Sequence, residues 1–148
     1  MSKPANPVET TDNLQDQTMQ RSNTDNAPRS AIHQTLYSAD TFVQHDYIAG
    51  KNLPDIVRPQ EGQINWLHFV GINDVTLLKH ALEPYGIHEL VIEDILSRKQ
   101  RPKIEDYGSY VFTAAQVYHY TSTGKLYSDQ VYVIIGKDFV LSFQQKPL

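Results

Sequence analysis

The sequence contains no cysteine among its 148 residues. Disulfide bonds, thiolate nucleophiles, cysteine-ligated zinc and iron–sulfur clusters are therefore excluded, and the composition fits a reducing compartment. Long apolar runs are missing as well. The longest, Val131–Ile135, has five residues, whereas a membrane-spanning helix needs about 20. The N-terminal residues contain no apolar stretch of the kind found in a secretory signal. We expect no part of this sequence to cross a bilayer.

Positive charge is also scarce. Thirteen lysine and arginine residues stand against seventeen aspartate and glutamate residues, which gives a formal net charge of −4. A surface of this sign does not attract phosphate backbones, so nucleic acid is not an expected partner. The sequence has no glycine-rich phosphate loop, no G-x-S-x-G nucleophile elbow and no H-E-x-x-H metal motif. We therefore expect a protein that is not an enzyme.

Aromatic residues are absent from residues 1–30, although the chain has nine Tyr, five Phe and one Trp. Asn, Gln, Thr, Ser and Pro dominate this segment, and so little apolar surface cannot offset the entropy of ordering the chain. The sequence thus predicts a disordered polar tail over residues 1–30. It predicts one folded domain over residues 31–148, a length suited to a single core.

Hydrophobic periodicity predicts the elements of this domain. Alternating or continuous apolar residues bounded by turn residues indicate strands, and apolar residues repeating every three or four positions indicate helices. Strands are expected over 64–70, 110–120, 130–135 and 139–144, with shorter strand patterns at 41–43 and 47–48, and helices over 75–85 and 88–97. Asn73 or Asp74 offers a cap for the first helix, which Gly86 closes. This order predicts an α/β domain with a mixed sheet, largely antiparallel in its C-terminal meander, and flanking helices.

The six histidines, at positions 33, 45, 68, 80, 88 and 119, raise the question of a metal site. No two of them are three or four residues apart, the spacing that places two imidazoles on one helix face. A zinc site built from them is therefore not expected.

Arg98, Lys99, Arg101 and Lys103 form a basic cluster around Pro102. Cations that follow an acidic helix commonly form its solvated C-terminal end, and Pro102 stops the helix and sets the entry of the next strand. We interpret the cluster as a structural turn, with binding of a phosphate or an acidic partner as the alternative.

Glu93 and Asp94 are the candidate metal-ligating residues. Adjacent helical carboxylates point about 100 degrees apart, so each can offer an oxygen to a hard cation that lies along an interface. Mg²⁺ keeps several waters and takes only one or two carboxylates, so such a site needs few protein ligands. A solvated acidic face is the alternative interpretation. Glu89, four residues before Glu93, adds a like charge that a counter-ion would relieve.

Several short motifs occur in one collinear order between residues 36 and 148. They are Ile64-Asn65-Trp66, Gly86-Ile87-His88, Leu90-Val91-Ile92-Glu93-Asp94-Ile95-Leu96, Gln100-Arg101-Pro102-Lys103, Tyr110-Val111-Phe112, Ser128-Asp129-Gln130-Val131 and Phe139-Val140-Leu141-Ser142-Phe143-Gln144. In this order the motifs resemble the N-terminal cytosolic domain of the CorA family of magnesium and cobalt transporters.

The resemblance implies an αβα-layered cytosolic domain, followed in the family by a very long helix and two membrane helices, in a homopentamer of the inner membrane. It places on Glu93 and Asp94 the family's acidic pair, which helps to form a divalent-cation site facing an aspartate of the neighbouring subunit's long helix. The implied ligand is regulatory, weakly bound Mg²⁺ or Co²⁺, and the implied partners are divalent cations and identical subunits. The only methionines are Met1 and Met19, so the family's Gly-Met-Asn pore tripeptide is not in this sequence. The expected role is therefore that of a sensing domain without the pore.

Three other functions stay open at this point. One is a small metal-dependent hydrolase that uses Glu93 and Asp94 as ligands, although the sequence shows no third convergent acid, general base or oxyanion device. The second is a free-standing module that associates with transporter subunits or with itself. The third is the cytosolic domain of a zinc-transporting relative.

Overall fold

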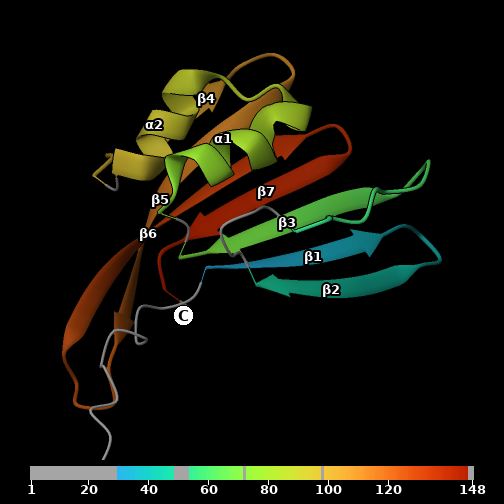
Figure 1. Cartoon of the computed structure of the whole chain (residues 1–148). Helices are drawn as coiled ribbons and strands as arrows, with labels where there is room; N and C mark the ends of the chain where they lie inside the picture. The colour runs from blue at the N-terminus through green and yellow to red at the C-terminus, as the bar shows by residue number, and fades with distance from the viewer. Residues whose placement is uncertain (1–29, 49–53, 72, 98, 147–148) are drawn as a thin grey trace, which may run out of the picture.

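The computed structural model describes residues 30–48, 54–71, 73–97 and 99–146. They form one seven-stranded sheet in the order β2-β1-β3-β7-β6-β5-β4, with short helices packed on it (Figure 1). The predicted disordered tail falls almost entirely on residues 1–29, which lie outside the described residues. Among the described residues, no helix has the length and hydropathy needed to span a membrane.

The sheet is mixed, as the sequence predicted. Its strands are β1 (Ala31–Tyr37), β2 (Phe42–Ile48), β3 (Ile64–Val70), β4 (Lys103–Asp106), β5 (Tyr110–Tyr120), β6 (Leu126–Gly136) and β7 (Phe139–Gln144). The helices are α1 (Val75–Leu82), the 3-10 turn η1 (Glu83–Tyr85) and α2 (Glu89–Ser97). Neighbouring strands pair antiparallel except β3 and β7, which are parallel. The mixed α/β class with a largely antiparallel C-terminal meander is therefore confirmed.

The core lies between the helices and one face of the sheet. Alternation along β3 points Leu67 and Phe69 toward the helices and Trp66 and His68 to the opposite side. The buried cluster unites residues from α1 and α2 with residues from β1, β3, β5, β6 and β7, among them Ile32, Leu78, Leu82, Val91, Ile95, Phe112, Ile134, Leu141 and Phe143. Within the described residues, one helical layer covers one face of the sheet (Figure 1).

The opposite side of the sheet, called the outer face below, carries exposed apolar side chains. Phe42 and Ile48 of β2 are each 67% exposed, and Ile104 of β4 is 75% exposed. Their register positions place them away from the helical layer. The helices of the described chain therefore leave the outer face uncovered.

Asp74 caps the start of α1 as expected, and the end of the helix differs from the prediction. The Asp74 carboxylate accepts hydrogen bonds from the backbone N–H groups of Thr76 and Leu77, at 2.8 and 3.0 Å, and thereby satisfies two of the helix's orphan donors. The α-helix stops at Leu82, one turn earlier than the periodicity indicated, because Pro84 has no N–H to continue the ladder. Gly86 closes the turn with a φ of 60°.

Four strands differ from the sequence prediction. β1 is not among the predicted strands, because the inward-facing Gln34 interrupts its apolar alternation. β4 is a further strand that the apolar pattern does not indicate, since Lys103 and Glu105 take its inward positions. β6 begins at Leu126, four residues before the predicted start, in a part of the hairpin that is mostly exposed and has no core pattern. The two short patterns near residue 45 are one strand, β2.

Candidate functional site

Helix α2 carries the predicted metal-ligating pair. Three of its residues are buried in the core, and its N-terminal end is tied to β5 because the His88 N–H donates to the Tyr110 hydroxyl at 2.9 Å. Successive residues of an α-helix point about 100 degrees apart. Glu93 is accordingly exposed, whereas Asp94 is half-buried and turns toward β4. The two acids therefore occupy different environments, although they are neighbours in the chain.

The Asp94 carboxylate is engaged inside the domain. Its Oδ2 atom lies 2.6 Å from Lys103 Nζ, and its Oδ1 atom accepts a hydrogen bond from Gln100 Nε2 at 2.7 Å. The side chains of Asp94 and Lys103 are 21% and 28% exposed. Asp94 thus has an internal cationic partner, and a metal ion that used this carboxylate would have to compete with Lys103.

Lys103 is the centre of a small charge network. Its ammonium also donates to Glu105 at 2.9 Å and lies 5.4 Å from the centre of the Phe112 ring. Hydrogen bonds to Asp94 and then to Glu105 raise the pKa of Lys103, and the hydrogen bond from Lys103 lowers the pKa of Glu105. Lys103 therefore has a structural role as the first residue of β4. Arg98 lies outside the described residues.

Glu93 belongs to a separate, solvent-facing group on α1 and α2. The Lys79 ammonium of α1 pairs with the Glu89 carboxylate of α2. This hydrogen bond is the main reason that the pKa of Lys79 is raised, and the charge of Glu93 adds a smaller contribution. Lys79 is therefore the counter-ion that relieves the repulsion between Glu89 and Glu93. A cation from solvent can therefore reach the exposed Glu93 carboxylate while the contacts of Asp94 inside the domain stay intact.

Convergent metal ligands are few in this region. Across the described ranges, no group of three or more His, Cys, Asp or Glu side chains could hold a metal ion. Glu93 and Asp94 by themselves supply two carboxylates pointing in different directions, which suits a largely hydrated cation. Their role as metal ligands stays a prediction.

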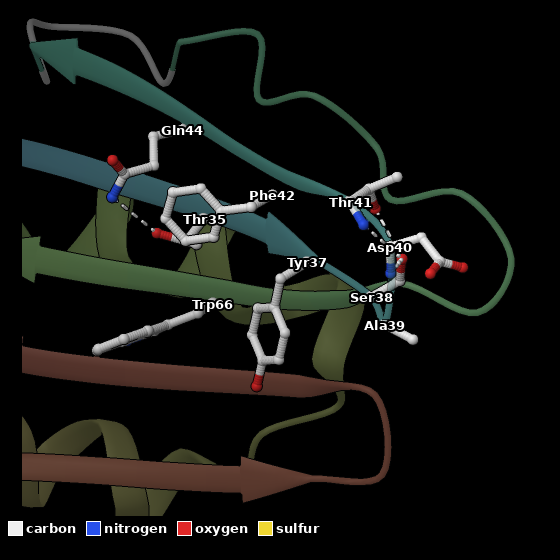
Figure 2. Close-up of a pocket in the computed structure, with 9 residues that line it drawn as sticks. All are labelled: Thr35, Tyr37, Ser38, Ala39, Asp40, Thr41, Phe42, Gln44 and Trp66. Carbon is white, nitrogen blue, oxygen red and sulfur yellow. Dashed lines mark hydrogen bonds between the residues drawn. The ribbon is translucent and has the colours of Figure 1, made fainter.

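An open groove of about 610 Å³ lies on the outer face (Figure 2). Tyr37 of β1, Phe42 of β2 and Trp66 of β3 line it and are 37%, 67% and 43% exposed. Figure 2 shows the three rings standing in front of the sheet, with the helices behind it. A turn closes one end, where Ser38 N–H donates to the Thr41 carbonyl at 2.9 Å. Sequence reasoning missed this groove because its rings come from three different strands.

The comparison with protein families matches residues 61–148 to the model described as CorA-like Mg²⁺ transporter protein. The matched range contains β3, the helices and the whole meander. A curated relative, the cobalt/magnesium transport protein CorA of Thermotoga maritima, is 40% identical over 82 residues, which cover 55% of this chain and 23% of the relative. The chain thus matches less than a quarter of the length of that relative.

Solved structures show the same fold. The full-length CmaX protein matches with a TM-score of 0.59 and 15% identity over 81% of this chain and 36% of that one. The complete CorA magnesium transporter from Methanocaldococcus jannaschii matches with a TM-score of 0.57 and 11% identity over 79% and 33%. At these identities the two structures support the fold and leave the chemistry to be argued from the residues.

Proposed function

We propose that this chain, which belongs to the CorA-like Mg²⁺ transporter family, is the cytosolic metal-sensing domain of a transporter of divalent cations, Mg²⁺ or Co²⁺. The relative from T. maritima is named for both ions. The domain would lie on the cytoplasmic side of the inner membrane, in a homopentamer whose pore is built by a separate membrane part. The observation that carries the proposal is the exposed carboxylate of Glu93 on α2, beside the internally paired Asp94.

Unequal exposure gives the two acids different parts in the proposed site. Glu93 offers its carboxylate to a hydrated Mg²⁺ ion from solvent, since few protein ligands suffice for an ion that keeps most of its waters. Asp94 is held by Lys103 and Gln100, so it contributes a fixed negative charge next to Glu93 and ligates only when it leaves Lys103. A site with so few ligands binds weakly, which suits a sensor of millimolar Mg²⁺.

The proposed regulation is a shift between two assemblies. Mg²⁺ bound between Glu93 of one subunit and an acid of its neighbour would screen their repulsion and favour the closed arrangement. Loss of Mg²⁺ would favour separation of the subunits and opening of the pore. Such a ligand acts only through its different affinity for the two arrangements. The domain supplies one half of this interface, so we expect it to bind Mg²⁺ feebly on its own.

The test is Mg²⁺ inhibition of transport in the transporter that carries this domain, with Glu93→Gln as the variant. Glu93→Gln removes the exposed charge without disturbing the Lys103 network, so inhibition by intracellular Mg²⁺ is expected to weaken or disappear. Asp94→Asn is a poorer single variant because it also breaks the ion pair with Lys103. The double variant Glu93→Gln/Asp94→Asn should lose the response completely.

Glu61→Gln is the matched control, because Glu61 is an exposed glutamate outside the helices and its loss should leave inhibition unchanged. Full Mg²⁺ inhibition in the double variant would overturn the assignment of the site.

A free-standing interaction module is the second candidate, and the exposed apolar residues of the outer face favour it. Sedimentation of the 148-residue chain separates the two functions. A sensing domain is expected to stay monomeric with and without Mg²⁺, since its opposing acid is on another segment. Stable self-association that is independent of Mg²⁺ would favour the interaction module. A metal-dependent hydrolase gains no support, because no third acid joins Glu93 and Asp94 among the described residues.

A further inference from the structure

A polar row crosses the outer face of the sheet. Asp46 of β2, His33 of β1, His68 of β3 and Ser142 of β7 occupy one register line, because His33 pairs with both Asp46 and His68, and His68 pairs with Ser142. The two histidines are 35 positions apart in sequence. Antiparallel pairing makes them direct cross-strand neighbours, whose side chains share one face of the sheet. The sheet thus brings together two imidazoles that no helical spacing relates.

Each imidazole is held at its Nδ1 atom. His33 Nδ1 lies 2.7 Å from Asp46 Oδ1, and His68 Nδ1 lies 2.8 Å from Ser142 Oγ. Ser142 Oγ also accepts a hydrogen bond from Trp66 Nε1 at 2.9 Å, which its second lone pair allows. When Nδ1 of a histidine donates to such a partner, the lone pair of Nε2 is left to bind a ligand. Metal-ligating histidines in proteins are oriented in this way by carboxylates and other acceptors.

The two rings lie close enough to serve one ion. Their centres are 6.0 Å apart, and their planes differ by 27°. Two nitrogens bound to one Zn²⁺ at 2.0 to 2.1 Å lie roughly 3.3 Å from each other. To bind one ion, the rings would have to rotate toward each other, with Nδ1 still held, until the Nε2 atoms reach that separation. His33 is exposed and His68 is half-buried, so the ion is reached from the solvent.

We infer that His33 and His68 form a two-imidazole site for a borderline divalent metal ion such as Zn²⁺, Ni²⁺, Co²⁺ or Cu²⁺, with Asp46 and Ser142 as positioning residues and water as the remaining ligands. Imidazole suits these ions, whereas Mg²⁺ prefers oxygen. The outer face lies on the side of the sheet opposite α2. The site is therefore separate from Glu93 and Asp94 and independent of the proposed function.

The surroundings of the two imidazoles favour a bound cation. Burial, and then the charge of His33, lower the pKa of His68, which favours the neutral imidazole that binds a metal. The charged group that faces the pair within the described residues is Asp46, whose carboxylate favours a cation beside His33. Protons compete with a metal ion for imidazole nitrogen, so binding should weaken as the pH falls.

The test is calorimetric titration of the full chain with ZnCl₂ at neutral pH, followed by ¹⁵N NMR of the imidazoles. Wild type is expected to bind one Zn²⁺ with displaced Nε2 signals of His33 and His68. His33→Gln and His68→Gln should each weaken this binding at least about tenfold, and Asp46→Asn should weaken it by a smaller factor, as expected for a partner that orients a ligand. Millimolar MgCl₂ should not displace the ion.

His45→Gln is the matched control. His45 lies on β2 next to Asp46, but its register partner is the inward-facing Gln34, so it is on the other side of the strand. This variant should bind Zn²⁺ like wild type. Circular dichroism of each variant verifies the fold, and His33→Gln replaces an exposed side chain that the core does not need. Unchanged binding in both His33→Gln and His68→Gln, or an equal loss in His45→Gln, would overturn the site.

Discussion

Replacement of Gln34 by leucine is expected to destabilise the domain by about 2 kcal/mol, because Gln34 joins a buried network of polar side chains. Gln34 is 1% exposed and Asn65 is 3% exposed. Gln34 Nε2 donates to the Val57 carbonyl at 2.7 Å and to Asn65 Oδ1 at 2.9 Å, and its Oε1 accepts from the Tyr47 hydroxyl at 3.0 Å. Asn65 Nδ2 in turn donates to the Tyr85 hydroxyl at 2.8 Å. The network therefore connects β1, β2, β3 and η1.

The expected magnitude follows from the partners that are left behind. In Gln34→Leu the buried Asn65 Oδ1 loses its donor, and a buried acceptor without a partner costs about 1 to 3 kcal/mol. For a domain of this size each kcal/mol lowers Tm by about 4 °C. Asn65→Leu should cost a similar amount, since it removes a partner of both Gln34 and Tyr85. The double variant should cost at least about 1 kcal/mol less than the sum, because neither residue then leaves the other unpaired.

Urea unfolding measures these differences through the fluorescence of Trp66, which is the chain's single tryptophan and lies next to Asn65 on β3. Gln116→Leu is the control, because Gln116 on β5 is exposed, and its replacement should change the free energy of unfolding by less than about 0.5 kcal/mol. The reasoning is refuted if Gln34→Leu is no less stable than Gln116→Leu, or if the two core substitutions are strictly additive.

Two further predictions concern α1 and the Lys103 network. Asp74→Ala should destabilise the domain by about 1 kcal/mol, because two backbone N–H groups of α1 lose their acceptor. Thermal unfolding measures this loss, and an unchanged Tm would contradict the capping role of Asp74. Lys103→Met should be less stable than wild type near pH 7, by an amount that shrinks toward about pH 3. The reason is that the hydrogen bond from Lys103 lowers the pKa of Glu105 in the folded state. The stabilisation from this pair is present above the ordinary glutamate pKa of 4.5 and is lost as the pH falls through the lowered pKa of Glu105. Urea unfolding at both pH values measures the difference, with the exposed Lys99→Met as control, and a difference that is the same at both values would contradict the network.

Strong local periodicity predicted several elements correctly. β3, β5 and β7 have the bounds that their apolar patterns indicated, and Asp74 and Gly86 fulfil the capping roles expected of them. These features depend on residues within about a dozen positions of one another, so one sequence is sufficient to see them. β1 and β4 were missed because polar residues take inward positions, where only partners distant in the chain can satisfy them. Gln34 needs Asn65, and Lys103 needs Asp94.

The candidate site stays a prediction, and the sequence indicated its two residues without their surroundings. The sequence drew attention to Glu93 and Asp94, and the family motifs gave them a proposed role that stays untested. The sequence could not show that Asp94 has Lys103 as an internal partner while Glu93 faces solvent. That difference depends on where β4 lies relative to α2, which is a matter of packing.

The sequence by itself determined the helices and strands that have strong local periodicity, such as β3, β5 and β7, because steric and hydrophobic preferences act between near neighbours along the backbone. Only the tertiary structure decided which strands are adjacent, since burying one face of seven strands against two helices selects a single order and register. In this arrangement β7 runs parallel to β3, and His33 lies opposite His68. No local pattern contains those pairings, because the contacting residues are separated by tens of positions and meet only when the core forms.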